Sequence, residues 1–215
     1  MFHRSARLFS LLLLLAGPVS AESVDFAIDS PASDIHWRIY SDGPLPLGHN
    51  HIISTSRISG SVRLADAPEA SHFELLIPVA ALLVDSPALR QRYGKQFSSR
   101  VSPRARAGTR ANMLGNSLLN AAHHPDIRLG GSAVVARDKR RQNLVLDTTL
   151  ELAGRSIRLK IPAQIEFGDR EVRARGHFTL SHSQLGLAPF RAALGALRVA
   201  DNIDFTYDIQ ARRTE

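Results

Sequence analysis

Apolar and polar residues alternate with a period of two along most of the chain after residue 22. The alternation is clear in two early segments, Val24–Ile28 and Ile35–Tyr40, which Ser30 and Pro31 separate. A period of two puts one set of side chains on each face of an extended strand. The pattern therefore predicts a β protein whose strands bury one face and expose the other.

The same alternation recurs further along the chain. Two segments, Ile58–Leu64 and Phe73–Val79, flank a turn at 66–71 and predict a β-hairpin. Antiparallel strands that close into a barrel leave no open edge. We therefore predict an all-β fold, an extended antiparallel barrel of about eight strands, whose remaining strands are expected at Ile127–Ala136, Leu144–Leu152, Ile157–Phe167, Val172–Leu180 and Asp201–Ala211.

The middle of the chain departs from this pattern. Ser86 as N-cap and Pro87 in the first turn predict a short helix that reaches Tyr93. A second helix is expected over Thr109–Ala122 from its apolar stripe, with an exposed loop over Gln96–Gly108 before it. The barrel should therefore carry one or two short helices in a crossing segment.

The first 21 residues have a different character. Met1–Ala21 combines a basic start, an apolar run over Leu8–Ala16 and small residues at its end, which is the pattern of a secretory signal peptide. The run is shorter than the roughly 20 residues that span a bilayer. We expect a periplasmic or secreted protein with one domain at residues 22–215, and the absence of cysteine excludes disulfides and thiolate metal sites.

The formal net charge of +7 is concentrated in part between Arg90 and Arg110. Such a cluster is typical of a solvated surface, with peripheral contact to anionic headgroups or to an acidic partner as the alternative. Nucleic acid is not an expected partner, because few aromatic residues interleave these charges to stack bases.

Catalytic motifs are missing from the sequence. Gly-x-Ser-x-Gly, His-Glu-x-x-His and phosphate-binding glycine loops do not occur, and there is no cysteine nucleophile. The paired carboxylates Asp25 with Asp29 and Asp204 with Asp208 fall on polar strand faces. We therefore do not expect an enzyme.

Three segments together resemble a known family. Arg110–Leu129 leads through a His-His-Pro-Asp-Ile element into a strand, Leu150–Pro162 contains an Ala-Gly turn between alternating residues, and Gly176–Leu187 has a Gly-x-Phe start and a Leu-Gly-Leu end. In this order they resemble the YceI-like, polyisoprenoid-binding proteins of bacteria. The chain differs in a longer 86–108 segment, in His123 and His124 before Pro125, and in Leu185 before Gly186.

The resemblance implies an extended lipocalin-like barrel that holds a polyprenyl lipid or isoprenoid quinone in an apolar interior. A barrel of about eight strands has room for one slender ligand, although the same side chains could simply fill it as core. Trp37 and Tyr207 are favoured among the candidates, because each carries a polar atom that could face a quinone head. The candidate ligand-binding residues are Trp37, Ile39, Leu75, Ile77, Leu146, Leu150, Phe178, Phe205 and Tyr207.

Histidines provide an alternative hypothesis. His49 and His51 are two residues apart at the start of a strand, so both rings would lie on one face and could bind Zn, Cu or Ni. Two ligands do not make a site, and ordinary hydrogen-bonded histidines would show the same spacing. The metal hypothesis requires a third ligand from His36, His177, His182, His123 or His124.

Overall fold

The computed structural model describes residues 23–43, 48–65, 70–134, 141–192, 194 and 196–215. The predicted signal peptide at residues 1–21 lies outside these residues. Eight antiparallel strands close on themselves in the order β1-β4-β5-β7-β8-β9-β10-β12, with β12 pairing back to β1. The predicted antiparallel barrel is confirmed. Its strands are β1 (Ser23–Ile28), β4 (Ser59–Ala65), β5 (His72–Pro78), β7 (Asp126–Val134), β8 (Arg141–Leu152), β9 (Arg155–Phe167), β10 (Glu171–Ser181) and β12 (Leu197–Arg213).

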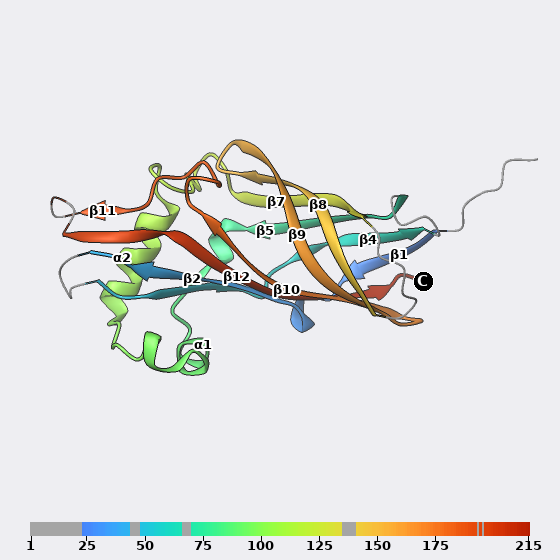
Figure 1. The fold of residues 1–215 in the computed structure, drawn as a ribbon, viewed down its shortest axis with the longest axis horizontal. Coiled ribbons are helices and arrows are strands. Elements are labelled where there is room, and N and C mark those ends of the chain that lie inside the picture. The colour runs from blue at the N-terminus through green and yellow to red at the C-terminus, as the bar shows by residue number, and fades with distance from the viewer. Residues whose placement is uncertain (1–22, 44–47, 66–69, 135–140, 193, 195) are drawn as a thin grey trace, which may run out of the picture.

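The last strand, β12, pairs with four other strands along its 17 residues. Its C-terminal end closes the barrel, because Ala211–Arg213 pairs with Phe26–Ile28 of β1. Its earlier part pairs with β2 (Asp34–Ser41), which leads on to β3 (His51–Thr55) and β6 (Leu83–Val84). The two-residue β11 (Arg191–Ala192) also pairs with β12. The result is an elongated barrel with the helical segment at one end (Figure 1).

Strands β9 and β10 pair over a short stretch only. Gln164–Phe167 pairs with Val172–Arg175, and beyond this point these two described strands separate. Strand β10 nevertheless stays paired with β12 as far as Ser181. The barrel wall therefore opens between β9 and β10 toward the helical end.

The helical segment follows the prediction at its start and departs from it later. The first helix, α1 (Pro87–Arg92), is confirmed, although the Ser86 side chain makes no capping hydrogen bond. The second, α2 (Pro103–Leu114), begins and ends earlier than the predicted Thr109–Ala122. The reason is a second Ser-Pro start, since the Ala105 N–H donates to Ser102 Oγ at 3.1 Å.

The segment Gln96–Gly108 is largely exposed, as the sequence predicted, but it is not a loop throughout. It contains the end of a 3-10 turn, η4 (Gly94–Phe97), and the first half of α2. The Phe97 ring is only 1 % exposed and lies 6.0 Å from the ring centroid of Tyr40. This segment is packed onto the barrel exterior through an aromatic contact.

Asp85 joins α1 to β3. Its side chain is fully buried, at a positive φ of 56°, and accepts from Ile52 N–H at 3.0 Å and Arg90 Nη1 at 2.7 Å. His51 Nδ1 lies 2.7 Å from its second oxygen. Burial alone would raise the pKa of Asp85, but the hydrogen bonds from His51 and Ile52 N–H and the neighbouring Arg90 lower it.

The basic cluster is therefore partly structural. Arg90 also donates to the Asn50 carbonyl, and Arg110 donates to the Ala80 carbonyl, each at 2.7 to 2.8 Å. Within the described ranges, none of the helices has the length and apolar character needed to cross a bilayer.

Candidate functional site

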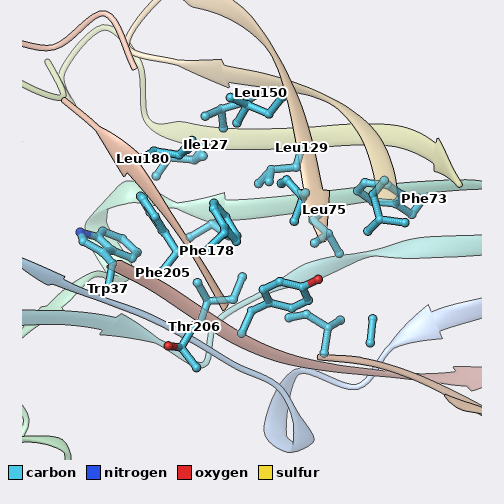
Figure 2. Close-up of a pocket in the computed structure, with 18 of the residues that line it drawn as sticks. Trp37, Phe73, Leu75, Ile127, Leu129, Leu150, Phe178, Leu180, Phe205 and Thr206 are labelled. Atoms are coloured by element: carbon cyan, nitrogen blue, oxygen red, sulfur yellow. The ribbon is translucent and has the colours of Figure 1, made fainter. Parts of the chain in front are cut away.

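A cavity of about 520 Å³ runs through the barrel and is lined almost entirely by apolar side chains. Figure 2 shows part of this lining, from Trp37 at one side to Phe73 at the other. All nine candidate residues from the sequence line the cavity; that they bind a ligand stays a prediction. They are Trp37, Ile39, Leu75, Ile77, Leu146, Leu150, Phe178, Phe205 and Tyr207.

The strand register builds the aromatic part of this lining. Phe205 of β12 pairs with Phe178 of β10 on one side and with Trp37 of β2 on the other. The Phe178 and Phe205 rings stack with centroids 5.1 Å apart, and the Trp37 ring lies 6.0 Å from Phe205. Because alternate residues share a face, the next inward layer along these strands is Leu180, Ile203 and Ile39.

These inward-facing aromatic side chains are only half-buried. Trp37, Phe178 and Phe205 all have intermediate exposure although they point into the barrel. Packed cores leave few voids larger than a water molecule. The lining therefore surrounds a real space, and these side chains do not merely fill the barrel.

Tyr207 lines the cavity, but its hydroxyl is engaged in a hydrogen bond within the barrel wall. Its O–H donates to the Pro162 carbonyl at 2.8 Å, and burial raises its pKa. Gly176 makes this contact possible, since an added Cβ there would lie 2.6 Å from the Tyr207 hydroxyl and 2.5 Å from the Pro162 oxygen. Tyr207 is thus held in the wall, which leaves Trp37 as the better of the two polar candidates.

Several solved structures of bacterial proteins resemble this barrel. BcnA of Burkholderia cenocepacia is 12 % identical to this chain and superposes with a TM-score of 0.59. The alignment covers 85 % of this chain and 98 % of BcnA. A polyisoprenoid-binding domain from Saccharophagus degradans is 10 % identical, with a TM-score of 0.58. The alignment covers 89 % of this chain and 99 % of that domain. The YceI protein of Campylobacter jejuni is 13 % identical, with a TM-score of 0.51. The alignment covers 76 % of this chain and 85 % of that protein.

The chain has the YceI-like fold. No sequence-family model matches it, and no curated protein matches its sequence. At 10 to 14 % identity the likeness is one of fold, and it agrees with the architecture predicted from the alternating pattern. The ligand of this YceI-like barrel therefore has to be inferred from the side chains that line its cavity.

One buried polar residue of the YceI-like barrel was considered in the sequence only as a metal ligand. His182 is 3 % exposed, lines the cavity, and places Nδ1 2.9 Å from the Asp201 carbonyl oxygen. It continues the inward phase of Phe178 and Leu180 by two residues. That phase was the signal in the sequence that would have placed it in the cavity.

Apart from His182, the histidines of the metal hypothesis do not line the cavity, and they do not converge. The His49 and His51 rings are 6.4 Å apart at their centroids, and His51 is engaged by Asp85. His36 is buried between Asp34 and Tyr93, and His177 is exposed on β10. Within the described residues, no group of three His, Asp or Glu side chains is placed to hold a metal ion.

Proposed function

We propose that this protein is an exported carrier of the YceI-like family that binds a polyisoprenoid or isoprenoid quinone inside its barrel. The observation that carries the proposal is the elongated apolar cavity of about 520 Å³. Ligand pockets for small molecules have volumes of about 300 to 1,000 Å³ and are mostly apolar. The fold neighbour described as a polyisoprenoid-binding domain supports the chemical class of the ligand.

The lining itself favours an apolar occupant. A ligand that lies against these walls removes their apolar surface, and its own, from contact with water. The hydrophobic effect would therefore supply most of the binding free energy.

The lining also determines what kind of ligand is retained. Each methylene removed from water contributes about 0.8 kcal/mol, whereas a wall of Leu, Ile and Phe side chains offers few polar contacts. Affinity should then rise with the length of the apolar chain. An isoprenoid combines this length with a slender cross-section.

Export is part of the proposal and rests on the pattern of Met1–Ala21. Outside the cytoplasm, a free isoprenoid would partition into membranes or aggregate, so a soluble barrel would shield it from water. Peripheral contact with a membrane through the exposed cations Arg92, Lys95, Arg100 and Arg104 would be compatible with loading.

Native mass spectrometry of the protein purified from its host's periplasm or culture medium tests the proposal. Organic extraction and elemental analysis of the same sample should give a stoichiometric isoprenoid and no stoichiometric metal. Stoichiometric metal without lipid would favour the His49 and His51 hypothesis instead. Absence of the protein from both the periplasm and the medium would contradict export.

A variant pair locates the ligand. Phe205→Asp places a charge in the cavity and should abolish isoprenoid retention. Val145→Asp places the same charge on β8 at a side chain that is 41 % exposed, and it should retain the ligand. Equal retention by both variants would show that the ligand binds elsewhere.

A further inference from the structure

The inward-facing lining contains two polar atoms that have no hydrogen-bond partner in the described part of the chain. One is Trp37 Nε1, and the other is Nε2 of His182. The remaining polar lining groups are accounted for. Ser71 Oγ bonds to Ala65, while His72 and Thr206 have the opposite strand phase to the inward-facing residues beside them.

The hydrogen-bond role of His182 is determined by its other nitrogen. The Asp201 carbonyl can only accept, so Nδ1 must carry the hydrogen of the 2.9 Å bond. In a neutral imidazole the second nitrogen is then an acceptor with no hydrogen. His182 therefore offers the cavity a lone pair, at a side chain that is only 3 % exposed.

Trp37 offers the complementary group. An indole N–H is a donor only. In Figure 2 the indole nitrogen lies on the side of the Trp37 ring away from Phe73. The paired register of β10 ends at Ser181, and His182 follows beyond the layer of Leu180, Ile203 and Ile39, whereas Trp37 belongs to the layer before it. Acceptor and donor are therefore two separate polar positions of the lining.

We propose that the end of the cavity beyond Leu180, Ile203 and Ile39 is a head-group subsite for a hydroxyl, with His182 as the acceptor. A hydroxyl can donate to His182 Nε2, whereas a quinone carbonyl or an ether can only accept. The barrel would then select a polyprenol or a reduced quinol over the corresponding ether or quinone. This inference rests on the proposed function and specifies the ligand class.

A buried acceptor makes such selection sharp. A ligand without a hydroxyl hydrogen leaves the lone pair of His182 unpaired in an apolar cavity, and unpaired buried polar groups are unfavourable. Sites built to pair with a hydroxyl reject analogues that lack it far better than apolar sites reject an extra methylene. We expect at least a tenfold preference for the alcohol.

Binding of three matched probes to the delipidated full-length protein tests this: geranylgeraniol, its methyl ether, and the hydrocarbon without the oxygen. Wild-type protein should bind the alcohol at least tenfold more tightly than the ether. His182→Leu should remove that difference while the hydrocarbon affinity stays the same. His177→Leu, at an exposed position on β10, should behave as the wild type.

The outcomes separate the two proposals. If none of the three probes binds, the carrier function itself is wrong. If all three bind the wild type equally, the cavity binds isoprenoids but the hydroxyl subsite is wrong. Should His182→Leu fail to fold, the ¹⁵N shift of His182 Nε2 in the wild type decides, because it should move with the alcohol and stay unchanged with the ether.

Discussion

The Tyr207 hydroxyl donates to the carbonyl of Pro162, 2.8 Å away, at the place where β9 leaves β10. Pro162 has no N–H, so β9 presents an acceptor but no donor at this position. The tyrosine reaches it across Gly176, its register partner on β10. One side chain therefore replaces a main-chain ladder bond in the barrel wall.

Tyr207→Phe should lower the free energy of unfolding by about 1 kcal/mol, the usual net contribution of one hydrogen bond. The loss should be modest because Pro162 is exposed and water can reach its carbonyl. Urea denaturation measures it as a lower midpoint with an unchanged slope. An unchanged midpoint would show that the bond contributes nothing to closing the wall.

Gly176→Ala should destabilise the protein by about 1 to 3 kcal/mol, as overpacking in a close-packed site does. The added Cβ would lie 2.5 Å from the Pro162 oxygen and 2.6 Å from the Tyr207 ring, so the strands must shift. Gly130→Ala on β7 is the matched control, because its nearest atom would be 3.7 Å away. Thermal unfolding of both variants checks the contrast, and an equal loss of stability would refute the crowding argument.

Asp85→Asn should destabilise the protein by about 3 to 5 kcal/mol at neutral pH, because it leaves Arg90 without its buried counter-charge. Asparagine tolerates the positive φ of this position, so the effect reports the charge. Asp25→Asn is the control, since its pair with Arg63 is exposed and should contribute little. Chemical denaturation of each variant at pH 7 gives the comparison.

The same variant has a predicted pH dependence. The pKa of Asp85 is lowered in the folded state, so its ionised form stabilises the fold above the unfolded pKa of about 3.9. That contribution is lost as the pH falls through the folded-state pKa. The stability difference between wild type and Asp85→Asn should therefore shrink in acid, and a constant difference from pH 7 to pH 2 would contradict the assignment.

Phe97→Ala should loosen the α1 and η4 segment while the barrel stays closed. The ring is 1 % exposed, and removing a buried Phe costs about 3 to 5 kcal/mol. Amide hydrogen exchange should accelerate over residues 87–100 and remain unchanged in β8 and β9. Phe190→Ala, at a side chain that is 41 % exposed, should leave both regions unaffected. Faster exchange in β8 and β9 would show that the segment supports the barrel itself.

The strands could be predicted from the sequence because their alternation is strong and independent of tertiary context. The cavity could not be distinguished from a filled core in the same way. Inward-facing residues such as Phe178 and Phe205 have the same pattern in both cases, and only the three-dimensional spacing of the strands shows that space is left between them.

Two other features were not predicted correctly from the sequence, each for its own reason. The start of α2 carries the same Ser-Pro signal at Ser102 and Pro103 that correctly predicted α1, but the apolar residues Met113 and Leu118 drew the prediction too far along the chain. Asp85 gave no local signal at all. Its burial arises only once His51 and Arg90 are brought to it from either side in the sequence.

Strand β12 has a consequence for how the protein acquires its ligand. The barrel closes through pairing of residues 26–28 with residues 211–213, which are almost the whole chain apart. Contacts of such long range make folding slow and keep the closing step late. The interior therefore comes into existence only after the last strand is in place, and an isoprenoid taken up by this protein would be loaded after the chain has folded.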